Sequence, residues 1–252
     1  MSTLNQEVID LLNSGINLSQ SAKDFVLTTI NSSPYLIDQI NQDVAGRLLT
    51  GFDGTKSKGF GGAFSPVSDH MLLPVDANNN LTSSSIENMV FVLGHEIQHS
   101  QNAYATNTAY VQYKLDVQSA VAQSVTDFTS IALAYQLSQN RDESIAQISG
   151  WNAYVSYMYM KNPNVTAAEL YFGTTRSHDF MQDSTGKAIG GMTFDTDNFG
   201  NPVYTVTASG ENITAQGNQY FLNTNTNLSG SNNYQLTYPA RVGRTRLQCA
   251  AC

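Results

Sequence analysis

The sequence predicts a mostly helical α+β fold with a small antiparallel sheet and a loop-rich C-terminal region. The chain has 252 residues, of which 41% are apolar and 13% charged, so it can bury a core as a single domain. Helical patterns occupy the N-terminal third and the middle, and Gly-, Asn- and Thr-rich sequence follows. We therefore expect one domain over 1–252, made of a helical part with a Gly-rich loop (1–64), a core (65–161) and a loop- and strand-rich part (162–252).

Short helices are expected first, over 4–13 and 19–30, and a third helix opens at Ser33-Pro34 because proline suits the first helical turn. The stretch GFDGTKSKGFGGAFS (51–65) follows and carries five glycines. It lacks the residue order of a phosphate-binding loop, so we predict a flexible loop or lid.

The central region continues with one strand over 71–75 and a helix capped within Ser83–Ser85. Long helical patterns cover 109–140 and 141–161, with a break expected near Asn140-Arg141. Further along, PVYTVTAS (202–209) and NQYFLNT (218–224) alternate as short strands do.

The net charge of −8 argues against nucleic acid or an anionic membrane as a partner, because both require a basic surface. No apolar run reaches the roughly 20 residues that span a bilayer. The N-terminal MSTLNQEVIDLLNSG lacks the basic and apolar regions of a signal peptide, so we expect synthesis in the cytoplasm.

The two cysteines, Cys249 and Cys252, both lie in the terminal QCAAC. They cannot cross-link a core, because nothing else in the chain is available to pair with them. A local disulfide or a chance sequence is favoured over a prenylation box, since cysteine is an atypical last residue for such a box.

The segment VLGHEIQHSQNA (92–103) contains the pattern H-E-x-x-H. On a helix, His95 and His99 lie four residues apart on one face and can bind one Zn²⁺. Glu96 beside them can act as the general base toward a zinc-bound water that attacks a carbonyl. The pattern predicts a zinc-dependent hydrolase, and Gly94 leaves room for a neighbouring element.

A catalytic zinc needs a third protein ligand. A third histidine in an H-x-x-G-x-x-H continuation is excluded, because positions 102 and 105 are Asn102 and Ala105. The spacing of thermolysin-like enzymes falls near Gln123, which is not a carboxylate. Glu143 is preferred because it shares a polar helical face with Gln147 and Tyr154. The alternatives that remain are Asp142, Asp116, Asp127 and His178.

Peptidases of this kind often stabilise the oxyanion with a further donor. The candidates are His178, Arg176 and Tyr154, although a loop histidine or a packed tyrosine is commonly structural. His70 could line the cleft near an edge strand, or could simply be satisfied by Asp69 in a turn.

The segment VLGHEIQHSQNA together with RDESIAQISGWNAYV (141–155) resembles the zincin metallopeptidase domains carried at the C-terminus of some VgrG spike proteins of bacterial type VI secretion. The resemblance covers roughly 65–160. It implies a zincin-like fold, Zn²⁺ bound by His95, His99 and Glu143, and Glu96 as the base. It also implies an antibacterial toxin delivered by an injection system into a target cell, with the periplasm as one destination, and a cognate immunity protein or a secretion spike as partner.

The function expected from these observations is a gluzincin-like zinc metallopeptidase acting on a peptide or protein. Two alternatives stay open. One is a zinc amidase acting on peptidoglycan peptides, and the other is a non-catalytic binding module whose zinc is structural and closed by a fourth ligand.

Overall fold

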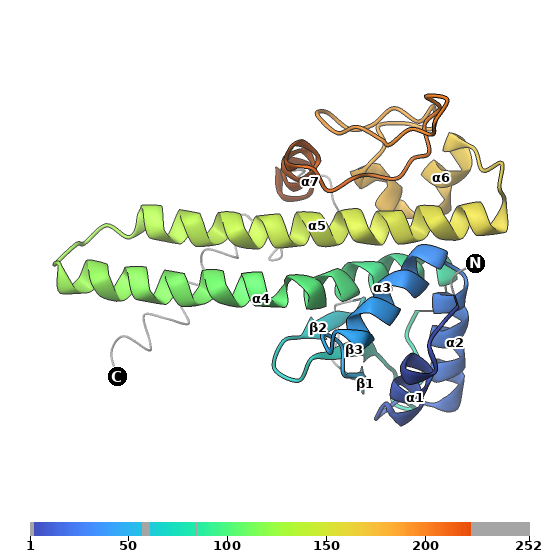
Figure 1. The fold of residues 1–252 in the computed structure, drawn as a ribbon, viewed down its shortest axis with the longest axis horizontal. Helices are drawn as coiled ribbons and strands as arrows, with labels where there is room; N and C mark the ends of the chain where they lie inside the picture. The colour runs from blue at the N-terminus through green and yellow to red at the C-terminus, as the bar shows by residue number, and fades with distance from the viewer. Residues whose placement is uncertain (1–2, 57–60, 84, 223–252) are drawn as a thin grey trace.

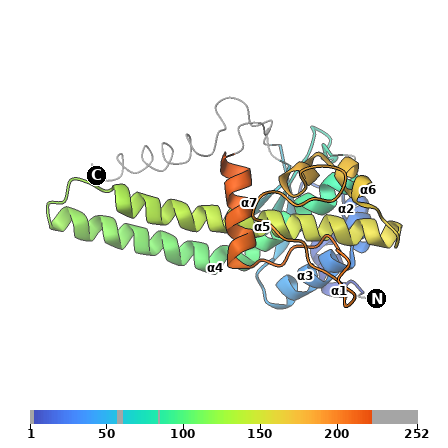
Figure 2. The same ribbon diagram turned by 90° about the horizontal axis from the view of Figure 1, so that it is seen from above.

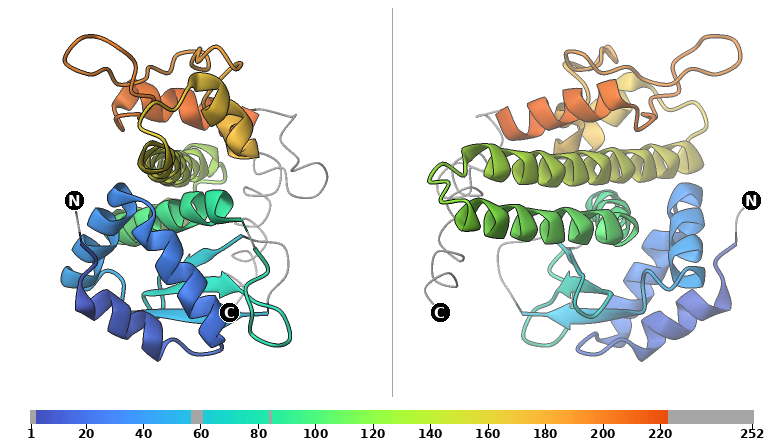
Figure 3. Two further views of the ribbon diagram at one scale, coloured as in Figure 1. Left: turned by 90° about the vertical axis from the view of Figure 1, so that its right-hand side faces the viewer. Right: turned by 60° about the vertical axis from the view of Figure 1, so that its left-hand side comes forward.

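Two long antiparallel helices form the centre of the molecule (Figure 1). The computed structural model describes residues 3–56, 61–83 and 85–222. Helix α4 (Ile86–Ala122) has 37 residues and α5 (Thr129–Lys161) has 33. Helices α1 (Gln6–Ser14), α2 (Gln20–Asn31) and α3 (Pro34–Ala45) lie with a small sheet against α4. Helix α6 (Ala167–Gly173), the 3-10 helix η1 (Thr175–Asp179) and α7 (Gly210–Leu222) lie on the side of α5, as the end view in Figure 3 shows.

The N-terminal helices begin where capping residues predict. The Ser19 side chain accepts a hydrogen bond from the Ala22 amide at the start of α2. Ser33 does the same for Leu36, with proline in the first turn of α3. These caps satisfy amides that no helical carbonyl can reach. The three helices predicted in this region are therefore present.

The sheet is mixed, so the prediction of an antiparallel sheet is wrong. Strand β1 (Gly51–Thr55) runs parallel to β3 (His70–Pro74), and β2 (Ala63–Ser65) pairs with β3 in the antiparallel sense. The register places Phe52 beside Met71, and both side chains are fully buried. Strand β2 takes the opposite edge of β3, where it contacts α4.

The prediction of a flexible loop over 51–65 is wrong for the two strands in that range. Glycine is needed there for close packing: a Cβ on Gly54 would lie 1.9 Å from the carbonyl oxygen of Asn17. Residues 57–60, which include Gly59, lie outside the described residues.

The helical break lies at 123–128 and not near Asn140-Arg141, through which α5 runs without interruption. Ser124 adopts a positive φ of 57°, and the Val125 amide donates to the Ala120 carbonyl at 2.9 Å. This is the bonding pattern that ends helices in a left-handed residue. Asp127 then accepts a hydrogen bond from the Thr129 amide as α5 begins.

The strands predicted in the C-terminal part are absent from the described residues. Residues 218–222 belong to α7, and 223–224 lie outside the described range. Over 202–209 the extended chain bonds to α5 side chains: Trp151 Nε1 donates to the Tyr204 carbonyl at 2.7 Å. The Asn152 side chain donates to the Val206 carbonyl and accepts from the Val206 amide. Side chains of a helix thus replace a partner strand.

Helices α4 and α5 form a hairpin. Its distal half, which lies next to the turn at 123–128, extends beyond the rest of the molecule (Figures 1 and 2). Several apolar side chains are exposed along it, among them Tyr104, Val111, Leu115, Leu133 and Leu137. None of the described helices combines the length and apolar composition that crossing a bilayer requires.

The proximal half of the hairpin is closely packed because two glycines meet between the helices. A Cβ on Gly94 would lie 2.7 Å from the Ala153 Cβ, and one on Gly150 would lie 2.7 Å from the Phe91 carbonyl oxygen. The Ser149 hydroxyl donates to the Gly94 carbonyl at 2.9 Å across the same contact. Only residues without a side chain allow the backbones to approach this closely.

A buried carboxylate fastens α3 to the same part of α4. Asp43 is 0% exposed and accepts hydrogen bonds from the Ser100 hydroxyl and the Gln101 amide group. Burial raises the pKa of Asp43 to about 6, although both hydrogen bonds favour the charged form.

The substitution Gly94→Ala is expected to destabilise the protein. The new methyl group forces α4 and α5 apart, and such overpacking costs about 1–3 kcal/mol, more than the roughly 1 kcal/mol gained in helix propensity. Urea denaturation measures the change. Gly190→Ala is the matched control, because nothing lies within 4 Å of a Cβ there. Equal stabilities of the two variants would contradict the close packing.

The substitution Asp43→Asn is expected to change how stability depends on pH. Because the folded pKa lies above the ordinary value of 3.8, the unfolded chain loses its proton first. The wild type therefore loses stability relative to the variant as pH rises from about 4 to 6, by on the order of 2–3 kcal/mol. Denaturation at pH 4.5 and pH 7 tests this, and a difference that is constant with pH would refute it.

Candidate metal centre

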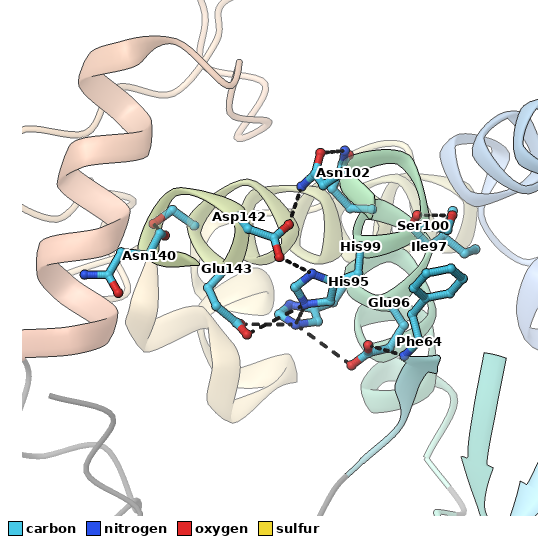
Figure 4. A network of polar contacts seen from close by, with 12 residues as sticks. Phe64, His95, Glu96, Ile97, His99, Ser100, Asn102, Asn140, Asp142 and Glu143 are labelled. Carbon is cyan, nitrogen blue, oxygen red and sulfur yellow. Dashed lines mark hydrogen bonds and ion pairs between the residues drawn. The ribbon is translucent and has the colours of Figure 1, made fainter. Parts of the chain in front are cut away.

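The two motif histidines lie on one face of α4, directly after the Gly94 contact. The helix begins at the Ser85 cap, whose side chain accepts from the Asn88 amide. The rings of His95 and His99 have centroids 4.7 Å apart, and their Nε2 atoms are separated by 3.0 Å. The spacing of four residues thus directs both imidazoles to one point, as Figure 4 shows.

Glu143 approaches this point from α5. Its Oε2 lies 3.6 Å from His95 Nε2 and its Oε1 lies 3.9 Å from His99 Nε2. The ligand atoms of all three residues lie within 4.8 Å of one another, so the group could hold a metal ion. Tetrahedral zinc with bonds of about 2.0–2.1 Å sets its ligand atoms about 3.3 Å apart. The measured separations bracket that value, and the residues therefore fit the ion.

Asp142 orients one of the two imidazoles. Its Oδ2 lies 3.1 Å from His99 Nδ1, and its Oδ1 accepts from the Asn102 side chain at 2.8 Å (Figure 4). When Nδ1 donates its proton to this carboxylate, the Nε2 lone pair faces His95 and Glu143. Asp142 was an alternative ligand on sequence grounds, and the structure places it behind His99.

Glu96 lies beside the cluster and is bound to the edge of the sheet. Its Oε2 accepts a hydrogen bond from the Phe64 amide on β2 at 2.9 Å, and its Oε1 is 3.9 Å from His95 Nε2. Burial raises the pKa of Glu96 to about 7, which the charge of His99 opposes and that of Glu143 reinforces. A carboxyl group with this pKa can both accept and release a proton near neutral pH.

The pKa values of the two imidazoles shift in opposite directions. Burial, reinforced by the charge of His99, holds the pKa of His95 well below its usual value. Burial also acts to lower the pKa of His99, but the Asp142 hydrogen bond and the charge of Glu143 outweigh it and raise the pKa to about 9. Burial raises the pKa of Glu143 as well. The cluster therefore places carboxylates around one imidazolium, and a metal ion bound by His99 would take the place of that positive charge.

A cavity of about 770 Å³ opens over the cluster. One wall is the edge of the sheet, with Gly62 and Phe64. At the other end the cavity reaches the distal hairpin at Asn107, Tyr110 and Tyr135. It is thus larger than a metal ion requires and matches the size of small-molecule and peptide sites.

The remaining residues predicted for the site lie elsewhere. Asp116 accepts from Gln112 on the distal hairpin, and Asp127 caps α5. Neither belongs to the metal-binding group, and His178 does not either.

The three predicted oxyanion or substrate contacts do not line the cavity. His178 lies against the Tyr171 ring, 4.6 Å between centroids. Tyr154 is fully buried and donates to the Leu170 carbonyl at 3.2 Å. His70 pairs with Asp53 at 2.6 Å, and not with Asp69. Arg176, the fourth residue considered, does line the cavity.

Two features of the site were not predicted from the sequence. The Phe64 amide is a backbone group in a stretch expected to be a loop, so its side-chain identity carried no signal. Tyr110 and Tyr135 come from two helices whose pairing depends on where the break lies, and the break was misplaced.

A comparison with models of protein families, with curated proteins and with solved structures found no match to this chain.

Proposed function

We propose that this protein is a zinc-dependent hydrolase, and specifically a metallopeptidase. The observation that carries the proposal is the convergence of His95, His99 and Glu143 on the wall of an open cavity, with Glu96 beside them. Two histidines and one glutamate are a donor set that catalytic zinc uses, with a coordination position left for substrate or water. A bound zinc ion would supply Lewis-acid polarisation of a carbonyl group and would acidify water.

The charge of the cavity supports a divalent cation. Its charged lining residues are Glu96, Asp142, Glu143 and Arg176. His95 and His99 must be neutral to bind a metal ion, and the three carboxylates and one guanidinium then carry a net charge of −2, which a divalent ion would neutralise. Buried carboxylates without such compensation are costly.

The protein's own residues would divide the work of hydrolysis. His95, His99 and Glu143 would hold the ion, and Asp142 would fix the orientation of His99. Glu96, whose Oε1 lies 3.9 Å from His95 Nε2, would take up a proton from the attacking water and return it to the leaving amine. The Phe64 hydrogen bond keeps the Glu96 carboxylate directed toward the cavity.

The open cavity favours catalysis over a structural zinc site, because a structural site is closed by a fourth protein ligand. An extended cavity beside an edge strand also suits a peptide substrate. Peptidoglycan peptides share this amide chemistry, and the experiment below therefore includes them as a second substrate.

The proposed biological role is that of an antibacterial effector that is injected into a target cell and is countered by an immunity protein. This part of the proposal depends only on the resemblance of 92–103 and 141–155 to the VgrG-linked zincin domains.

Metal content and hydrolysis test the proposed chemistry. The purified protein is expected to contain one zinc ion per chain by mass spectrometry of the metal, and His95→Ala or His99→Ala should lose it. Glu96→Gln is expected to retain the zinc and to lose hydrolysis by at least about 100-fold, because only the base is removed. Release of new amines from casein and from purified sacculi distinguishes a peptidase from an amidase. A zinc-free wild type, or a His99→Ala variant that hydrolyses normally, would contradict the proposal.

Asp142→Ala tests the orienting role of Asp142. Removing a carboxylate that holds a metal-binding imidazole weakens metal affinity by about 10–100-fold. Zinc affinity is measured by competition with a chromogenic chelator. Asp116→Ala is the control, since that residue only accepts from Gln112 on the distal hairpin. If both variants bind zinc like the wild type, Asp142 does not position His99.

A further inference from the structure

Arg176 is the single arginine or lysine among the described residues that line the cavity. It lies on η1, where its amide donates to the Thr174 side chain, and Thr174 in turn donates to Asn88 on α4. These two bonds fasten the backbone of η1 to the helix that carries the motif. The position of the Arg176 backbone is therefore set by α4, the helix that carries His95 and His99.

The guanidinium of Arg176 lies over the ring of Phe91, with 5.6 Å between its Cζ and the ring centroid. Phe91 is one helical turn before His95, and the two rings are stacked with centroids 6.5 Å apart. The guanidinium therefore lies about one helical turn along α4 from His95, and its charge acts on both His95 and Glu143. A group bound by Arg176 would lie next to the metal-binding group.

Burial raises the pKa values of Glu143 and of Asp179 and the charge of Arg176 acts to lower them, but the cavity carboxylates make their close contacts with other groups. Asp142 bonds to His99 and Asn102, Glu96 bonds to Phe64, and Glu143 faces the two histidines. Within residues 3–56, 61–83 and 85–222, no carboxylate oxygen lies within 4.0 Å of the Arg176 guanidinium. Arg176 is exposed and lines the cavity.

We propose that Arg176 selects substrates that carry a carboxylate next to the bond to be cleaved, and that it binds this carboxylate at the rim of the cavity. A guanidinium forms two parallel hydrogen bonds with a carboxylate, which gives both affinity and orientation. The carboxylate can come from the C-terminus of a peptide or from an acidic side chain. This inference depends on the proposed hydrolase function, because it assigns the substrate class of the same site.

Two matched pairs of peptides distinguish the sources. N-acetyl-trialanine is compared with its carboxamide for the C-terminal carboxylate, and N-acetyl-Ala-Asp-Ala-amide with the Asn analogue for the side chain. Binding to the zinc-loaded Glu96→Gln protein, which does not turn over the peptides, is measured by calorimetry. At least one acidic peptide is expected to bind about tenfold more tightly than its neutral partner.

The preference is expected to disappear in Glu96→Gln/Arg176→Gln and to return in part with Arg176→Lys, which keeps the charge but not the planar fork. Arg47→Gln is the control, since Arg47 lies in the turn after α3 and does not line the cavity. The absence of any acid preference, or a preference that survives Arg176→Gln, would overturn the proposal.

Zinc content is measured on the same samples, so the two proposals fail separately. If the protein binds no zinc but keeps an acid preference that depends on Arg176, the proposed hydrolase function is refuted. Carboxylate binding by Arg176 is then supported on its own. Normal zinc binding without the preference would refute only the role of Arg176.

Discussion

The close approach of α4 and α5 at Gly94 and Gly150 is the constraint on which the rest of the site depends. The metal-binding group takes two histidines from one helix and a glutamate from the other, so its geometry is set by the distance between the two helices. The Ser149 hydroxyl, which donates to the Gly94 carbonyl, also accepts from Gln39 on α3 at 2.7 Å. Three helices are thereby fixed at the position where the site begins.

Burial explains the electrostatic character of the site. The proximal hairpin is covered by α2 and α3 on one side and by α7 on the other, so its carboxyl groups are largely removed from water. Their pKa values rise where burial dominates, as for Glu96 and Glu143. The same burial that makes these groups costly to the fold makes them suited to hold a cation and to transfer a proton.

The cavity connects parts of the chain that have different roles. The sheet edge supplies the Phe64 amide to Glu96, η1 supplies Arg176, and the distal hairpin extends the cavity with Tyr110 and Tyr135. A peptide bound along this cavity would contact all three. The distal hairpin, which adds little to the core, gains a role as a wall of the proposed substrate site.

Local signals in the sequence determined the three N-terminal helices, their caps and the five-residue motif, because helix periodicity and capping depend on neighbours within one turn. The sequence also favoured Glu143 among the acids, from its place on a polar helical face, and the resemblance pointed to the same residue. The tertiary structure decided the parallel pairing of β1 with β3, the position of the helical break and the lack of strands after residue 201 within the described chain. It also placed Asp142 behind His99 and Arg176 at the rim, and kept His70, Tyr154 and His178 out of the cavity. These outcomes depend on contacts between residues far apart in the chain, and no local pattern of residue types encodes them.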